Sequence, residues 1–386
     1  MTPTASLPTT ASDRLAGGAQ TRTSLLGVAF ELTAERAADL DYVHAFVDAY
    51  DEADVGPDRR VAVRVVREPP PAVSEGEEVW VHRSKHGYWN FRGSADFGPP
   101  RVVAWHGKGV AVTVPDPLDA VTVAADPGLS PARAGEATFH VCRSLALYLR
   151  DAGRGNLLHA SAVECAGRAV LFVGGVNAGK TTLALESVLR HGCRPLANDR
   201  VLATAEAAPA VVSWPSYCSY AEGTLLRYPQ LHAAALAYER EECRYRTQRW
   251  GPSLAPRYTK DSKRVYPMVW FTDATGIRYR RRAPLGLLLH VRVSPEIPEP
   301  VLEPVRPDDD EARAGLLAML AEESFDTVEP SFYPWHGLAR PRGAPPLDDF
   351  VRRVDAAGVP VYRLELPAED LDFLAAALAV VRTEAP

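Results

Sequence analysis

The sequence predicts an α/β fold in which a small β-rich N-terminal domain precedes a larger domain built on a mixed sheet. Three observations support this prediction. Short apolar or alternating runs, separated by Gly and Pro, fill the chain from Ser24 to about Gly128. A glycine-rich loop stands between an apolar run and an amphipathic helix at residues 171–187. That apolar run follows another after a three-residue link, and so short a link requires an antiparallel hairpin.

The composition is that of a globular protein with about two domains. Of the 386 residues, 46 % are hydrophobic and 24 % charged, so the chain can bury a sizeable core. The net charge of −6 and the lack of a long apolar run argue against nucleic-acid and membrane partners. Residues 1–24 lack a signal-peptide pattern and are expected to form a disordered tail. We expect a cytoplasmic protein.

The five cysteines show no C-x-x-C spacing, and an odd count without a pattern does not indicate a disulfide framework or a zinc site. We expect reduced, partly buried thiols, as in most cytoplasmic proteins. The cysteines are Cys142, Cys165, Cys193, Cys218 and Cys243.

The N-terminal domain is expected to span residues 25–135 and to consist mainly of short strands. The spacing of apolar residues over 33–50 predicts one helix, with Thr33 as its N-terminal cap. The predicted strands are 59–66, 77–83, 102–107 and 109–114. No catalytic constellation is found in this domain.

The second domain is expected to span residues 136–386 and to open with a helix over 136–153. The hairpin and the glycine-rich loop follow, and the helix after the loop ends at Gly192. The hairpin strands are 157–164 and 168–173, the helix is 181–193 and the next strand is 194–203. Further strands are expected at 283–293 and 360–366, and helices at 307–325 and 368–381.

The glycine-rich loop fits the pattern G-x-x-x-x-G-K-[ST] of phosphate-binding loops. Its glycines let the backbone curl so that N–H groups at the start of a helix bind phosphate oxygens. Lys180 is expected to reach the β- and γ-phosphates, and the Thr181 hydroxyl to ligate Mg²⁺. We therefore predict ATP and Mg²⁺ as cofactors. The binding residues are Gly174, Gly175, Val176, Asn177, Ala178, Gly179, Lys180, Thr181 and Thr182.

Phosphoryl transfer to a hydroxyl also needs a carboxylate that orients or deprotonates the acceptor. Asp199 lies 19 residues after Lys180, at the far end of the strand that follows the loop's helix. An acid at that end faces the ligand crevice of an α/β layer. We predict Asp199 as catalytic base and metal ligand; the alternative is an aspartate that caps a turn. His159, on the preceding hairpin strand, is either catalytic or a satisfied core histidine.

Two interpretations stay open for the strongly basic segment 240–283 and for Trp214. The segment either supplies positive charge for the γ-phosphate or an acidic acceptor, or it forms a solvated face that balances the acidic region 307–325. Trp214 either lines the acceptor pocket or packs in the core beside Pro215. The candidate residues for acceptor binding are Asn198, Trp214, Lys260, Lys263 and Arg264.

The stretch "LLHASAVECAGRAVLFVGGVNAGKTTLALESVLRHGCRPLANDRV" (157–201) resembles the HPr kinase/phosphorylase family, whose catalytic domain is related to phosphoenolpyruvate carboxykinase. The match covers about 45 residues. "SWPSYCSYAEGTL" (213–225) and "VPVYRLEL" (359–366) resemble a broader branch of that family. Some members of this branch accompany natural-product clusters and phosphorylate a precursor peptide. The resemblance implies a P-loop kinase domain of this kind, and members are often homo-oligomers.

The resemblance also implies roles for individual residues. Lys180 and Thr181 match the family's loop lysine and hydroxyl, and His159 matches its active-site histidine. The pair Asn198-Asp199 matches a pair of aspartates, of which the family uses the first as its acid/base. An amide cannot accept a proton at neutral pH, so either Asp199 has taken over this role or the reverse phosphorolysis is lost. The family's later signature is absent, so recognition of HPr is not implied.

The leading hypothesis is an ATP- and Mg²⁺-dependent kinase that phosphorylates a Ser or Thr hydroxyl of a peptide or protein. Asp199 would be the base, His159 would organise it, and Lys180 would position phosphate. A kinase for a small metabolite is the first alternative, favoured by a closed aromatic pocket around Trp214 and Tyr217. A nucleotide-binding regulatory protein without turnover is the second, favoured by Asn198.

Overall fold

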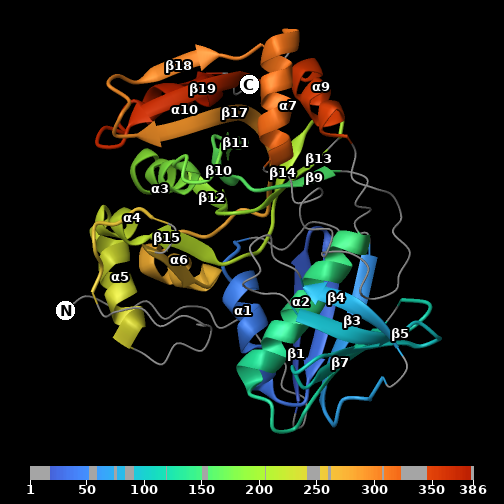
Figure 1. The fold of residues 1–386 in the computed structure, drawn as a ribbon. Helices are drawn as coiled ribbons and strands as arrows, with labels where there is room; N and C mark the ends of the chain where they lie inside the picture. Colours follow the sequence, from blue (N-terminus) through green and yellow to red (C-terminus); the bar gives the residue numbers. More distant parts are fainter. Residues whose placement is uncertain are drawn as a thin grey trace.

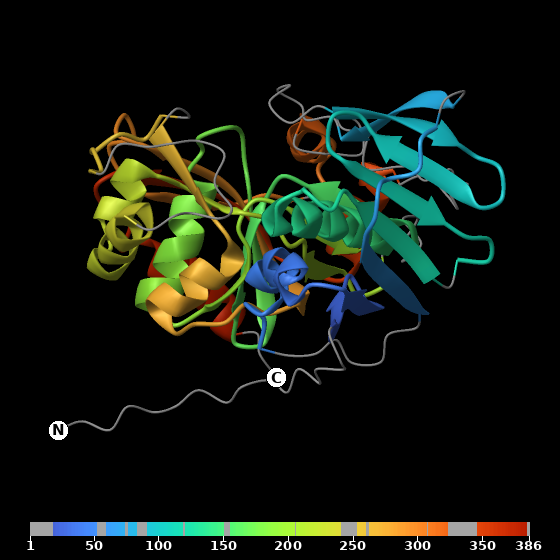
Figure 2. The same ribbon diagram turned by 90° about the horizontal axis from the view of Figure 1, so that it is seen from below.

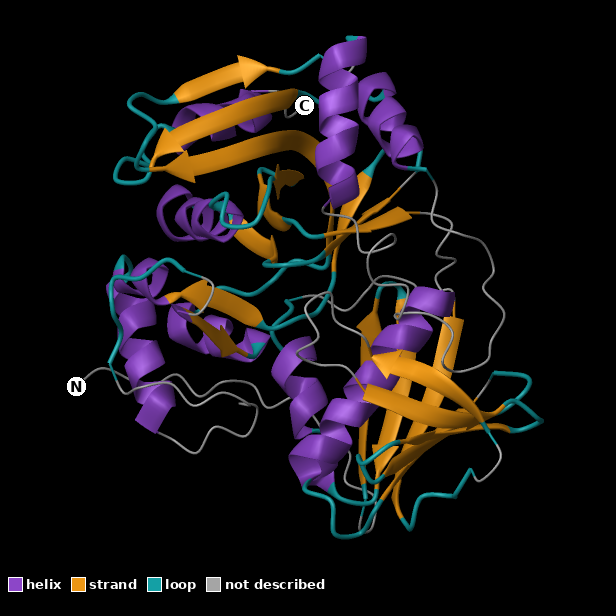
Figure 3. Cartoon of the chain, viewed as in Figure 1, coloured by secondary structure: helices purple, strands orange, loops and turns teal. Residues whose placement is uncertain are grey.

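The computed structural model of the protein shows a mixed α/β fold with two large sheets (Figures 1 and 3). This agrees with the predicted fold class. Lys260 and Cys243 lie outside the described residues. The structure describes residues 18–51, 59–73, 76–82, 91–118, 120–149, 155–204, 206–240, 253–259, 262–306, 308–322 and 346–383.

The first eight strands form one sheet, here called the N-terminal sheet, in the order β1-β2-β3-β8-β7-β6-β5-β4. β3 pairs in parallel with β2 and β8, and the other neighbours are antiparallel. The four strands predicted from the sequence coincide with β3, β4, β6 and β7. The bounds are β1 Ala19–Leu25, β2 Val28–Ala34, β3 Arg59–Arg67, β4 Glu77–His82, β5 Phe91–Asp96, β6 Arg101–Trp105, β7 Val110–Val114 and β8 Ala120–Ala125.

Two predictions about this part of the chain are wrong. Residues 19–24, expected in a disordered tail, belong to β1. The expected helix over 33–50 is reduced to a 3₁₀ turn, η1 (Ala37–Asp39), and to α1 (Asp41–Val47), because residue 33 lies in β2. A two-residue turn with positive φ at Leu26 and Gly27 joins β1 to β2, and the pairing of these strands continues to Ala34.

Helix α2 (Pro131–Leu149) packs on β1, β2, β3 and β8 and against α1. Its buried side includes Phe139, which stacks on Phe46 of α1 with ring centroids 4.4 Å apart. The expected domain boundary at residue 135 therefore cuts through α2. The helix lies with the N-terminal sheet (Figure 1).

The second sheet has β11 near its centre, between antiparallel β10 and parallel β17. Positive φ at Ala166 and Gly167 makes the β10–β11 connection a tight two-residue turn, so the predicted hairpin is confirmed. Its order is β12-β10-β11-β17-β14-β13-β9, with β19 beside β17 and β18 beside β19. The bounds are β9 Gly155–Leu158, β10 Ser161–Cys165, β11 Arg168–Val173, β12 Arg194–Ala197, β13 Val201–Thr204, β14 Ala210–Ser213, β17 Arg282–Ser294, β18 Val301–Pro304 and β19 Val361–Pro367.

Two predicted single strands are each interrupted. The expected strand 157–164 is β9 followed by β10, and the expected strand 194–203 is β12 followed by β13. The interruptions fall at residues 159–160 and 198–200. Both contain candidate catalytic residues.

Helices cover both faces of the second sheet. α3 (Lys180–His191) and α10 (Leu374–Thr383) share one core with β10, β11 and β17, and α7 (Asp310–Glu322) and α9 (Leu347–Ala356) share the other with β9, β11 and β17. As predicted, α3 ends at Gly192, which adopts a left-handed conformation. A smaller lobe holds β15 (Cys218–Ala221), β16 (Lys263–Tyr266), α4 (Glu222–Leu226), α5 (Pro229–Arg240) and α6 (Met268–Thr275).

The N-terminal sheet and the second sheet meet through α1 and the segment around Tyr279, as Figure 2 shows from below. The hydroxyls of Tyr50 and Ser213 are 2.7 Å apart, and Arg278 donates to the carbonyl oxygens of Asp48 and Tyr50 at 3.0 and 2.9 Å. Arg280 and Arg281 of the basic segment also contact this junction, at Asp51 and the Ser24 carbonyl. These arginines therefore join the two sheets.

A disulfide joins Cys165, at the end of β10, to Cys193, just after α3. The expectation of reduced thiols is wrong for this pair. The two cysteines are 28 residues apart in sequence, but the antiparallel pairing of Glu164 with Arg194 makes them neighbours. Cys142 and Cys218 are buried free thiols. Among the helices that the structure describes, none has the length and apolar character needed to span a membrane.

Candidate functional site

The glycine-rich loop connects the end of β11 to the start of α3, as a phosphate-binding loop requires. Gly179 caps α3 with a left-handed backbone (φ 93°), and a Cβ there would lie 2.5 Å from Cγ2 of Val293. A Cβ on Gly174 would lie 2.6 Å from the carbonyl oxygen of Val291. Both positions therefore need glycine because β17 packs directly against the loop.

Lys180 is buried, and its ammonium turns back into the loop. Its Nζ donates to the carbonyl oxygens of Gly174 and Gly175 at 2.5 and 3.0 Å. The backbone N–H groups of the first turn of α3 have no partner within the helix, as at every helix start. The loop thus presents a fixed cation and backbone donors in the same place, which suits phosphate oxygens.

The first turn of α3 also places two hydroxyls beside the loop. Thr181 and Thr182 are both half-buried, and Thr182 Oγ1 lies 3.5 Å from Thr224 Oγ1 of α4. On the opposite side, the Val293 amide of β17 donates to the Ala178 carbonyl at 3.0 Å. The loop is therefore held between the second sheet and the smaller lobe.

The two strand interruptions lie side by side. Residues 155–162 and 197–204 run antiparallel with the same offset before and after the gap, so the two chain segments continue together through it. The facing pairs on either side are Leu158 with Val201 and Ala162 with Ala197. Side-chain contacts replace the backbone ladder inside the gap.

Inside the gap, His159 Nε2 lies 3.3 Å from Asp199 Oδ1, and their side chains are 29 % and 37 % exposed. His159 is thus paired at a surface rather than sealed in the core. Burial raises the pKa of the Asp199 carboxyl, while the hydrogen bond and charge of His159 lower it. Arg200 and Lys263 add positive charge, and the pKa of Asp199 lies well below its ordinary value. Asp199 is therefore an anion at neutral pH.

The hairpin register brings this pair to the phosphate loop. Ser161 faces Phe172 in the β10–β11 ladder, so the residues just beyond, His159 on one chain and Gly174 on the other, lie at the same edge of the sheet. The structure thus brings together the loop, His159 and Asp199, which the sequence predicted separately.

The predicted acceptor-binding residues divide into two groups. Lys263, at the start of β16, is half-buried and acts on Asp199 through its charge. Arg264 is 1 % exposed and donates to Glu222 Oε1 at 2.9 and 2.6 Å, and Trp214 is 1 % exposed with the Arg143 guanidinium 4.6 Å from its ring centre. These two residues are core residues, so their assignment to an acceptor pocket is wrong; burial excludes contact with an acceptor.

Asn198 lies at the bottom of the gap. Its Nδ2 is buried with no hydrogen-bond partner among the described residues, and its carbonyl oxygen accepts the Ser161 hydroxyl at 2.6 Å. Asn198 also lines a small internal cavity, with Tyr220 and Tyr279 among the other lining residues. Its side chain is therefore directed inward and away from the half-exposed Asp199.

Sequence reasoning missed two residues near Asp199. Arg200 Nε lies 3.6 Å from Asp199 Oδ2, and Ser161 supports the residue that precedes it. The available signal was position alone, because Arg200 directly follows Asp199 and Ser161 stands two residues after His159.

The oxygen donors near the loop fit a Mg²⁺ ion that arrives with a nucleotide. Among the residues that the structure describes, no three His, Cys, Asp or Glu side chains gather as a metal site. The Thr181 hydroxyl and the Asp199 carboxylate are hard oxygen donors, and Mg²⁺ usually takes one or two protein oxygens together with phosphates and water. The roles of Thr181 and Asp199 as metal ligands stay predictions.

Comparison with known proteins gives one weak similarity. No protein-family model matches the sequence, and no curated protein matches it. Among solved structures, the chain is similar to the HPr(Ser) kinase/phosphatase from Coxiella burnetii, with 13 % sequence identity and a TM-score of 0.26. The alignment covers 59 % of this chain and 94 % of that one. At this level no residue role is transferred from that structure.

Proposed function

We propose that the protein is an ATP- and Mg²⁺-dependent kinase that transfers the γ-phosphate to a Ser or Thr hydroxyl of a peptide or protein. The observation behind this proposal is the arrangement of the site. A phosphate-binding loop and a half-exposed carboxylate with a histidine partner lie at the same edge of one sheet.

Each residue has a role in this proposal. Lys180 holds its ammonium at the loop for the β- and γ-phosphates, and the backbone donors at the start of α3 bind their oxygens. Asp199 accepts a hydrogen bond from the acceptor hydroxyl and orients it. Because its pKa lies below the ordinary value, it takes the proton only late in transfer. When bound, Mg²⁺ neutralises developing phosphate charge, and Thr181 and Asp199 are the residues that would hold it.

His159 and Asn198 determine what Asp199 can do. The 3.3 Å contact with His159 fixes one carboxylate oxygen and leaves the other toward Arg200. Asn198 offers an amide that cannot take a proton and is directed inward. Asp199 is then the single base, and we infer that the forward transfer is favoured over phosphorolysis.

A peptide acceptor is preferred over a small metabolite for a specific reason. A closed pocket for a metabolite would need Trp214 and Tyr217, but both are used elsewhere. Trp214 is buried under Arg143, and the Tyr217 hydroxyl lies 2.5 Å from that of Tyr42 in α1. The likeness of residues 213–225 and 359–366 to the peptide-modifying branch supports the same choice, including a natural-product precursor peptide as acceptor.

Phosphate transfer from γ-labelled ATP tests this proposal, with peptides and proteins of the organism's own lysate as acceptors. The wild type is compared with Asp199→Asn and with Asp348→Asn, a matched loss of a carboxylate that pairs with Arg313 and Arg352 on α9. We expect a labelled peptide or protein with the wild type and with Asp348→Asn, and a loss of about 10³-fold with Asp199→Asn.

Two results would contradict the proposal. ATP binding with no transfer to any acceptor would leave a nucleotide-binding regulatory protein. A labelled product of small-molecule mass would identify a metabolite kinase instead.

A further inference from the structure

Ser161 connects the strand of the phosphate loop to the chain segment of Asp199. It is the first residue of β10, and it is 1 % exposed. Its backbone is paired with Phe172 of β11, the strand that leads into the loop. Its hydroxyl donates a 2.6 Å hydrogen bond to the carbonyl oxygen of Asn198. One buried residue therefore contacts both parts of the site.

The position of the Asn198 carbonyl matters because it lies in the same peptide plane as the amide nitrogen of Asp199. The β10–β12 ladder has ended at residue 197, so this carbonyl has left the sheet. The hydroxyl of Ser161 supplies the hydrogen bond that a ladder partner would otherwise supply. Fixing this oxygen fixes the plane from which Asp199 projects.

Asp199 itself has few other restraints. Its carboxylate lies 3.3 Å from His159 and 3.6 Å from Arg200, and it is more than one-third exposed. A half-exposed side chain on an interrupted strand follows its own backbone. A shift of about 1 Å in a positioning group can reduce a transfer rate about 10²-fold.

We propose that Ser161 is a positioning residue that sets Asp199 relative to the phosphate loop. This inference rests on the proposed kinase function. Ser161 does not touch the reacting atoms; it acts through the Asn198–Asp199 peptide.

The pair of variants Ser161→Thr and Ser161→Val tests this proposal, because their side chains have the same shape and differ in one hydroxyl. We expect Ser161→Thr to keep kcat within about threefold of the wild type. We expect Ser161→Val to lower kcat by about 10- to 100-fold while the KM for ATP changes less than about twofold. Circular dichroism confirms that both fold.

Ser187→Ala is the matched control. The Ser187 hydroxyl is also buried and also donates to a backbone carbonyl, that of Leu183 at 2.8 Å, but this contact lies within α3. We expect its kcat to stay within about twofold of the wild type, so that loss of a buried hydroxyl alone does not explain the effect at Ser161.

A second readout does not depend on activity. The ring protons of His159, followed by NMR, report how near the Asp199 charge lies, and Arg200 and Lys263 are the other charged groups that act on Asp199. We expect His159 to titrate at a lower pH in Ser161→Val than in Ser161→Thr, because a displaced carboxylate stabilises the imidazolium less.

The outcomes separate this proposal from the kinase function. Equal kcat in the two variants, or a lower kcat in Ser161→Val with an unchanged His159 titration, would overturn the role of Ser161. If the wild type transfers no phosphate, the kinase proposal fails, and the His159 titration alone decides whether Ser161 positions Asp199.

Discussion

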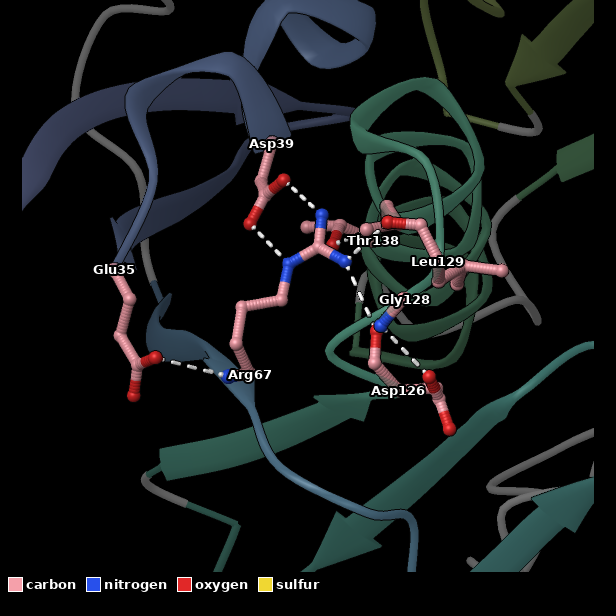
Figure 4. Close-up of polar contacts among 8 residues, drawn as sticks. Glu35, Asp39, Arg67, Asp126, Gly128, Leu129 and Thr138 are labelled. Atoms are coloured by element: carbon pink, nitrogen blue, oxygen red, sulfur yellow. Dashed lines mark hydrogen bonds and ion pairs between the residues drawn. The ribbon is translucent and has the colours of Figure 1, made fainter.

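Two ion pairs of this protein combine a carboxylate with a nitrogen cation in opposite surroundings. In the N-terminal sheet, Arg67 and Asp39 have side chains 3 % and 0 % exposed, and both Asp39 oxygens accept from the guanidinium (Figure 4). The remaining Arg67 nitrogen donates to the carbonyl oxygens of Asp126 and Leu129 at 3.1 and 2.7 Å. This pair is buried and its hydrogen bonds are saturated.

The pair at the candidate site is the reverse. His159 and Asp199 are about one-third exposed and share one 3.3 Å contact, so the carboxylate keeps acceptor capacity for a ligand. A saturated, buried pair holds the chain segments of η1, β3 and the start of α2 together. A half-exposed, unsaturated pair contributes little to stability and is free to bind. The same substitution in both places should therefore give opposite phenotypes.

The largest effect is expected for Asp39→Asn. It leaves the buried Arg67 guanidinium without its counter-charge, and breaking one side of a buried pair costs about 3–5 kcal/mol. Urea unfolding followed by circular dichroism measures this loss. We expect phosphate transfer per folded molecule to stay at the wild-type level.

Asp199→Asn is the counterpart, with an expected loss of stability below about 1 kcal/mol and loss of transfer. Similar losses of stability in the two variants would show that exposure and saturation do not separate the roles of these pairs.

The sequence allowed a good prediction of the loop and of its neighbours in the chain. Glycine spacing located the loop, the short link at Ala166-Gly167 predicted the hairpin, and Gly192 marked the end of α3. These features depend on backbone angles and short connections, which local residue types determine. Because the hairpin register is determined by its turn, the position of His159 beside Gly174 also followed.

The interruptions of the two strands could not be predicted from the same pattern. Leu158, Ala160 and Ala162 all face one core, so the alternation of apolar side chains continues through the break. A change of pairing partner leaves no trace in such a pattern. The burial of Trp214 and Arg264 and the Cys165–Cys193 disulfide likewise depend on partners distant in sequence. Residue type alone does not reveal such partners.

The comparison of the ion pairs becomes sharper if the site takes its stability from the backbone instead. Gly179→Ala would place a Cβ 2.5 Å from Val293 Cγ2 at a φ of 93°, and we expect a loss of about 1–3 kcal/mol. Gly175→Ala is the control in the same loop, because a Cβ there meets nothing within 4 Å and its φ is not positive.

Urea unfolding of the two alanine variants tests this prediction. We expect Gly175→Ala to stay within about 0.5 kcal/mol of the wild type. Equal losses at the two positions would mean that contact with β17 does not hold the loop. Titration with ATP should also show weaker binding for Gly179→Ala, because a shifted loop misplaces the backbone donors.

The smallest expected effect is the pH dependence of the Asp199 contribution to stability. Since the pKa of Asp199 is lowered in the folded protein, the unfolded chain binds the proton more readily, and stability decreases as the pH falls. The contribution is present at neutral pH and is lost from about pH 5 downward, through the lower pKa of the folded state. Because Asp199 is more than one-third exposed, its size is at most about 1 kcal/mol.

The difference in unfolding free energy between the wild type and Asp199→Asn, measured at pH 7 and again near pH 3, isolates this contribution. We expect a small advantage of the wild type at pH 7 that shrinks at pH 3, whereas the loss of transfer at pH 7 is complete. A large, pH-dependent difference would mean that Asp199 resembles Asp39 and holds the fold together. The separation of a small stability effect from a large transfer effect is what distinguishes a group available for chemistry from one committed to structure.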